Sequence, residues 1–223
     1  MEEMRRDLAR DNPIFANCKI SDSDLRTMWK NWKSFLGERE ALLAAGKFED
    51  YLLAFDGHKR FAAFREIHER MPDADYWKCV AFAWENIEVS LPDAKTWLAF
   101  FESKRPLRES LMTQGERKAL AGLPDTLTVF RGYAMHGGHG GRDGLSWTLS
   151  EAVARRFAEY ATGGRRAALC GHKRDATRMI ISGQCRKRDV LAYFNGRKER
   201  EIVVRPENVF AKHSRELKGK PTE

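Results

Sequence analysis

The sequence predicts an α+β protein in which a helical N-terminal half precedes a strand-rich C-terminal half. Three observations lead to this fold class. Apolar residues between positions 25 and 36 recur at helical spacing, β-branched residues at 202–204 favour a strand, and the segment 123–125 contains a proline between the two patterns. We therefore expect a helical region at 1–123 and a β-containing core at 124–223, and the sequence leaves open whether the helices form a separate domain or pack on this core.

The first long helix is expected to follow Ser21, whose hydroxyl can cap a helix N-terminus. Further helices are expected at 59–69, 74–87 and 94–101. The apolar stripe of the first helix contains Leu25, Met28, Trp29, Trp32, Phe35 and Leu36. We expect the tryptophans of this half to be core residues, and these are Trp29, Trp32, Trp77, Trp84 and Trp97.

A short helix is expected at the end of this half. Thr113 and Glu116 have the spacing of a capping box, in which each residue satisfies a backbone amide of the other. Gly122 then ends the helix, and the proline-containing segment 123–125 acts as a hinge into the first strand.

The first expected strand ends at an arginine. Leu127, Val129 and Phe130 suit a half-buried strand, Arg131 closes it, and Gly132 then frees the backbone to turn. A guanidinium can fork onto a diphosphate or hold a ribose hydroxyl, with a geometry that lysine lacks. The alternative is an ordinary surface arginine, since the chain has 40 lysines and arginines.

Two later segments carry polar groups on expected strands. Ser146 and Thr148 flank Trp147, so their hydroxyls share one strand face. Ser150 precedes an amphipathic run and is expected to cap a helix.

The last of these segments contains two glutamates. Glu199 and Glu201 open an apolar strand, and alternation places them on one face with Cβ atoms roughly 6.5–7 Å apart. Two carboxylates can then meet one substrate, as in enzymes that cleave glycosidic bonds through oxocarbenium-like transition states. The alternative is a solvated strand edge with alternating charges.

The order of these elements resembles the Arg-Ser-Glu class of ADP-ribosyltransferases, which includes arginine-modifying toxins, Rho-modifying exoenzymes and vertebrate ecto-transferases. The resemblance covers about residues 125–210 and implies a split antiparallel sheet that uses NAD as co-substrate. Glu201 would stabilise the oxocarbenium-like sugar, and Glu199 would orient or deprotonate the nucleophile. The NAD-binding residues would be Arg131, Gly132, Ser146, Trp147 and Thr148.

The resemblance has one departure and one further implication. Family members carry Ser-Thr-Ser or a close variant where this chain has Trp147 in the middle place, which could alter how nicotinamide stacks. The family also has an aromatic residue for target recognition in the turn before the catalytic strand. Tyr193 and Phe194 match it, and core packing of a short helix is the alternative.

The segment 136–144 contains five glycines and two histidines, His136 and His139. A zinc site would need further ligands, and Cys170, His172 and Cys185 make only a loose set, so we expect no metal. A flexible loop near the NAD site is the preferred interpretation, because glycines give the chain no fixed conformation.

Composition limits the partners and the compartment. The net charge of +8 favours anionic partners, including RNA or DNA, and basic clusters occur at 165–166, 173–174 and 186–188. Four cysteines without close pairing fit a reducing compartment. With no expected signal peptide or membrane span, a cytoplasmic location follows.

These observations predict an NAD-dependent mono-ADP-ribosyltransferase, a glycosyltransferase that moves ADP-ribose to a macromolecule. The paired glutamates favour protein arginine as the acceptor and the basic charge favours nucleic acid; of the two we prefer protein arginine. The alternatives are an NAD glycohydrolase without a transfer target and a non-enzymatic basic nucleic-acid-binding module. The resemblance suggests a toxin or a phage-type effector.

Overall fold

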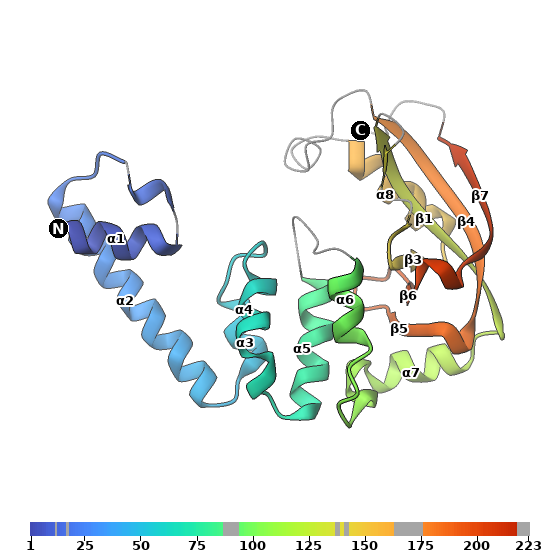
Figure 1. The fold of residues 1–223 in the computed structure, drawn as a ribbon, viewed down its shortest axis with the longest axis horizontal. Helices are drawn as coiled ribbons and strands as arrows, with labels where there is room; N and C mark the ends of the chain where they lie inside the picture. Colours follow the sequence, from blue (N-terminus) through green and yellow to red (C-terminus); the bar gives the residue numbers. More distant parts are fainter. Residues whose placement is uncertain are drawn as a thin grey trace. The chain divides into compact units, whose positions relative to one another are not determined.

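The computed structural model describes residues 1–11, 13–16, 18–86, 94–136, 139–140, 143–162 and 176–217 (Figure 1). The chain divides into two compact units, Met1–Asp56 and Gly57–Glu223. This division differs from the expected boundary near Leu123, because helices of the second unit bond directly to its sheet. Arg108 Nη2, for example, donates to the carbonyl of Leu191 at 3.2 Å.

The first unit contains helices only, within its described residues. Ser21 caps the long helix by accepting a hydrogen bond from the amide of Asp24, as expected. Leu25 of the apolar stripe is buried, whereas Trp29 and Trp32 are half-buried, so these two tryptophans are not fully enclosed core residues. The elements are α1 (Glu2–Asp11), η1 (Pro13–Ala16), α2 (Asp22–Ala44) and α3 (Phe48–Leu53).

The helices of the second unit follow the expected positions and enclose an aromatic core. Trp77 and Trp97 are fully buried and Trp84 is buried, which confirms the core assignment for these three. The capping box of Thr113 and Glu116 is also confirmed. The elements are α4 (Arg60–Ile67), η2 (His68–Arg70), α5 (Asp73–Glu85), α6 (Ala94–Phe101), η3 (Arg108–Leu111) and α7 (Gln114–Ala121).

The strands form one antiparallel sheet in the order β5-β6-β3-β1-β4-β7, with β2 paired to β1. Helices thus dominate the N-terminal part and strands the C-terminal part, which confirms the α+β class. The strands are β1 (Thr126–His136), β2 (His139–Gly140), β3 (Ser146–Thr148), β4 (Thr177–Arg186), β5 (Val190–Phe194), β6 (Glu201–Val204) and β7 (Phe210–Glu216). The remaining elements are α8 (Glu151–Thr162), η5 (Lys187–Asp189) and η6 (Pro206–Asn208).

The sheet narrows at its centre. β1 pairs with β4 along nearly its whole length, whereas β1 and β3 are joined at the single pair Phe130 and Thr148 within the described residues. The strands β5, β6 and β3 therefore form one group, and β1, β4 and β7 form another. The predicted site residues Arg131 on β1, Ser146 on β3 and Glu201 on β6 lie where these two groups of strands meet.

Gly132 has a different role from the one expected. The strand does not turn after Arg131 but continues through Gly132 to His136. A Cβ atom on Gly132 would lie 1.8 Å from the carbonyl oxygen of Ala154 in α8, so the missing side chain allows the helix to pack directly on β1. Ser150 caps this helix, as expected, through its Oγ and the amide of Val153.

We expect Gly132→Ala to destabilise the second unit by about 3 kcal/mol, the upper end of overpacking effects, because backbone atoms of α8 cannot rotate away. The free energy of unfolding in denaturant measures this loss. Gly115→Ala is the matched control. A Cβ there would meet its nearest atom at 4.0 Å, so alanine should be neutral or stabilise the helix by up to about 1 kcal/mol. Equal stability of the two variants would contradict the packing role of Gly132.

Candidate functional site

The Arg, Ser and Glu elements, far apart in the sequence, lie on three neighbouring strands. Glu201 opens β6 and pairs with Thr148, and Ser146 opens β3 and pairs with Val203. Arg131 lies on β1, the next strand along the sheet. The structure therefore brings these three elements into one region of the second unit.

Glu201 is a buried carboxylate with several donors. Its side chain is 7% exposed. Oε1 accepts hydrogen bonds from the hydroxyl of Ser146 at 2.5 Å and from the indole Nε1 of Trp84 at 3.0 Å. Oε2 lies 3.4 Å from Nη2 of Arg197. A buried charge needs such partners, because removal from water is otherwise strongly unfavourable.

Trp84 is the unexpected partner in this set. It lies at the end of α5, and its ring packs edge-on against Trp97 and Phe101 at centroid distances of 5.0 and 5.1 Å. This packing aims the indole N–H at Glu201 from the helical part of the unit. The sequence predicts Trp84 only as a core residue, since the spacing of apolar residues gives no sign of a long-range polar partner.

Glu199 does not lie on the strand that contains Glu201, contrary to expectation. β6 begins at Glu201, and Lys198 and Arg200 have positive φ angles of 58° and 49°. The backbone therefore curls before the strand, and strand alternation does not apply between the two glutamates. They nevertheless come together, because Arg197 Nη2 lies 3.0 Å from Glu199 Oε2 and 3.4 Å from Glu201 Oε2.

Thr148 and Asn195 fix the curled segment. The hydroxyl of Thr148, a buried residue, donates to the carbonyl of Glu199 at 2.6 Å. The Oδ1 of Asn195 accepts a hydrogen bond from the amide of Arg200 at 3.1 Å, and the amide of Lys198 donates to the carbonyl of Asn195, which closes a turn. Thr148 is thus a positioning residue for the glutamate segment.

Arg131 is held by the protein itself. Its Nη1 donates to the carbonyl of Ser146 at 2.6 Å, and a Cβ on Gly144 would lie 2.2 Å from its Nη2. Burial lowers the pKa of Arg131, while the carboxylates of Glu201 and Asp143 act in the opposite direction. Among the charged groups that act on Arg131, Glu201 has the largest effect, so the guanidinium and this carboxylate lie in the same region.

Three aromatic residues assigned to the site prove to be core residues. Trp147 is 1% exposed and donates its indole N–H to the carbonyl of Gly144, so it does not present a face for nicotinamide. Tyr193 and Phe194 are 5% and 2% exposed and lie on β5, not in a turn or a short helix. Alternation along the strands turns Trp147 and Tyr193 into the hydrophobic cluster beneath the sheet.

Acidic groups gather around Arg197. Burial raises the pKa of Glu201. Three contacts act in the opposite direction, namely the hydrogen bond from Ser146, the positive charge of Arg197 and the hydrogen bond from Trp84. Burial also raises the pKa of Glu85, with the negative charge of Glu116 as the second cause. Arg197 Nη1 bonds to the backbone carbonyl of Glu85 at 2.7 Å. One guanidinium therefore links α5 to both glutamates of the predicted catalytic pair.

The histidine-containing segment 136–144 is described in part. His139 pairs with His136 in a short β ladder, while residues 137–138 and 141–142 lie outside the described residues, as do Cys170, His172 and the basic clusters at 165–166 and 173–174. In the described part of the chain, no group of three or more His, Cys, Asp or Glu side chains is arranged to hold a metal ion. No helix among the described residues is both long and apolar enough to cross a bilayer.

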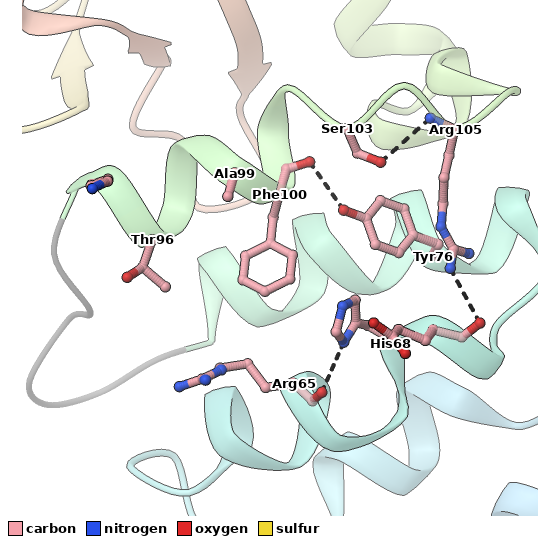
Figure 2. Close-up of a pocket in the computed structure, with 10 residues that line it drawn as sticks. Arg65, His68, Tyr76, Thr96, Ala99, Phe100, Ser103 and Arg105 are labelled. Atoms are coloured by element: carbon pink, nitrogen blue, oxygen red, sulfur yellow. Dashed lines mark hydrogen bonds between the residues drawn. The ribbon is translucent and has the colours of Figure 1, made fainter.

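The helical part of the second unit contains a separate pocket of about 810 Å³ (Figure 2). Tyr76, His68 and Phe100 lie close together in it, and the phenol of Tyr76 donates to the carbonyl of Phe100. Its charged lining residues are Arg65, Lys95, Arg105 and Glu69, so cationic groups outnumber the carboxylate. The pocket therefore favours an anionic ligand.

Comparison of the chain with models of known protein families, with curated proteins and with solved structures gave no significant match.

We expect Glu201→Gln to stabilise the fold at neutral pH. The pKa of Glu201 is higher in the folded protein than in the unfolded chain, where it is about 4.3. Protonated Glu201 therefore contributes fully to stability below the pKa of the unfolded chain, and this contribution is lost as the pH rises through the pKa of the folded protein. Each unit of difference corresponds to about 1.4 kcal/mol. Free energies of unfolding measured from pH 4 to 8 should show a gain for the variant that grows with pH.

Glu207→Gln is the control with the opposite sign. A hydrogen bond from its own backbone amide and another from Arg205 lower the pKa of Glu207, so its replacement should give no gain at neutral pH. A Glu201→Gln protein that is less stable than the wild type at pH 8 would show that the ionised carboxylate stabilises the fold.

Proposed function

We propose that the chain is an NAD-dependent mono-ADP-ribosyltransferase that cleaves nicotinamide from NAD and transfers ADP-ribose to a macromolecule. The observation that carries this proposal is the buried Glu201 carboxylate, which accepts a hydrogen bond from Ser146 and shares the guanidinium of Arg197 with Glu199. In the sheet, β3 alone separates the strand of Glu201 from the strand of Arg131. Each element of the Arg-Ser-Glu resemblance thus contributes to one region.

Glu201 is assigned to the developing positive charge on the ribose of NAD. Ser146 and Trp84 hold its Oε1 from two elements, so the carboxylate need not reorient during the reaction. Fixed charges of this kind give the largest catalytic effects in many enzymes. The contacts from Ser146, Trp84 and Arg197 also favour the ionised form that this role requires.

Glu199 is assigned to the acceptor. Its side chain is 16% exposed, more than that of Glu201, and it already contacts the guanidinium of Arg197 at 3.0 Å. A carboxylate in this position can orient an arginine side chain through charge-assisted hydrogen bonds and remove a proton from it. This contact supports protein arginine as the acceptor.

A nucleic-acid acceptor is the second candidate. The specific observation in its favour is the cationic pocket that includes Arg65 and Lys95, together with the net charge of +8. Incubation of the protein with labelled NAD and a cell lysate, followed by protease or nuclease, distinguishes the two. Release of label by protease supports arginine, and release by nuclease supports RNA or DNA.

Two variants test the assigned chemistry. Glu201→Gln should lower nicotinamide release and transfer by about a hundredfold to a thousandfold, because it removes the preorganised charge. Glu199→Gln should remove most of the transfer while slow NAD hydrolysis survives, because water needs little orientation by the protein. Both activities are measured on purified protein with labelled NAD.

Glu216→Gln, an exposed position on the edge strand β7, is the matched control and should retain both activities. A folded Glu201→Gln protein with full activity would end the assignment. If Glu199→Gln retains transfer, the chain does not use this residue for the acceptor. A wild-type protein that hydrolyses NAD and labels nothing would be a glycohydrolase, and one that leaves NAD intact would fit a binding module.

A further inference from the structure

One guanidinium of the protein itself already occupies the position that the proposed acceptor would take. Arg197 Nη2 lies 3.0 Å from Oε2 of Glu199 and 3.4 Å from Oε2 of Glu201. The same side chain is 46% exposed, so a substrate can reach it. The contact joins an arginine to the two groups assigned to NAD cleavage and to proton removal.

The local backbone holds Arg197 in this position. Arg197 lies in the turn between β5 and β6. Asn195 stabilises this turn, because its carbonyl accepts from the amide of Lys198 and its Oδ1 accepts from the amide of Arg200. Positive φ angles at Lys198 and Arg200 are unfavourable for residues with side chains, and here they curl the segment so that residue 197 faces the glutamates. Arg197 Nη1 is further anchored on the carbonyl of Glu85 at 2.7 Å.

We propose, on the basis of the function proposed above, that Arg197 is a self-modification site and accepts ADP-ribose from NAD within its own molecule. Glu199 takes a proton from Nη2, and the nitrogen lone pair forms a bond to C1′ of the nicotinamide ribose. The bond from C1′ to nicotinamide breaks, and nicotinamide leaves as a neutral molecule with the bonding electrons. One proton is released to water for each arginine modified, and the product guanidinium keeps its positive charge.

A consequence for activity follows from the position of the residue. A modified Arg197 carries two phosphates beside Glu199 and Glu201, so it obstructs the site and repels the next NAD molecule. The rate of transfer to external acceptors should therefore decline with time in the presence of NAD, in parallel with the modification.

The test is to incubate the purified full-length protein with NAD alone and to map the modified residue by peptide mass spectrometry. We expect one ADP-ribose per molecule, on Arg197, at a rate per molecule that does not change on tenfold dilution. Glu201→Gln protein mixed with the wild type should stay unmodified at Arg197, since transfer occurs within one molecule. Arg200→Lys, an exposed arginine in the same turn, is the matched control and should leave the mapped site unchanged.

Arg197→Lys should lose the label, and a parallel reaction with agmatine, a small guanidine compound, reports whether that variant still cleaves NAD and transfers. Wild-type protein that modifies agmatine but carries no label on Arg197 would overturn the self-modification while leaving the proposed function intact. Label on other arginines, or a rate that rises with protein concentration, would also overturn it. Absence of both NAD cleavage and labelling would overturn this inference together with the proposed function.

Discussion

The hydrogen-bonded burial of Glu201 is the constraint on which the candidate site depends. A carboxylate that is 7% exposed loses most of its hydration, and in this chain the replacement donors come from separate elements. Ser146 belongs to β3, Trp84 to α5 and Arg197 to the turn before β6. The site therefore forms only when the helices of the second unit and the sheet have assembled.

This dependence explains why helices α4 to α7 belong to the same unit as the sheet, a point that the sequence left open. The edge-on packing of Trp84 against Trp97 and Phe101 fixes the direction of the indole N–H. Gly144, before β3, allows the close approach of Arg131, and Thr148 holds the segment of Glu199. Small or polar residues at these positions determine how the residues of the candidate site are arranged.

Sequence patterns predicted the elements that depend on local interactions. The helices, the caps at Ser21 and Ser150 and the capping box at Thr113 follow from residues close in the chain, and each is confirmed. The strand of Glu201 was also expected, but its start was placed two residues too early. Arg200 has a positive φ angle, which ends the extended backbone before Glu201. The residue types of a Glu-Arg-Glu segment do not indicate such an angle, so the sequence could not predict it.

The errors of side-chain role have a common physical origin. Trp147, Tyr193 and Gly132 were assigned to the site through the resemblance to the family, whereas the burial of a residue depends on its sheet face and on what packs against it. Trp147 and Tyr193 face the hydrophobic cluster, and Gly132 faces α8. Conversely, Trp84 reaches Glu201 from helix α5 and Arg197 reaches it from a turn. The spacing of residues along the chain does not predict either contact.

Titration of the Glu201 carboxyl by carbon-detected NMR, with its signal assigned by its loss in Glu201→Gln, tests most directly whether this carboxylate is buried and held by α5. We expect a pKa above the ordinary value of about 4.3, because burial opposes the charged form. The pKa should rise further in Trp84→Phe, which keeps an aromatic ring but removes the donor to Oε1. An ordinary pKa that Trp84→Phe does not change would contradict the claim that α5 holds a buried catalytic carboxylate.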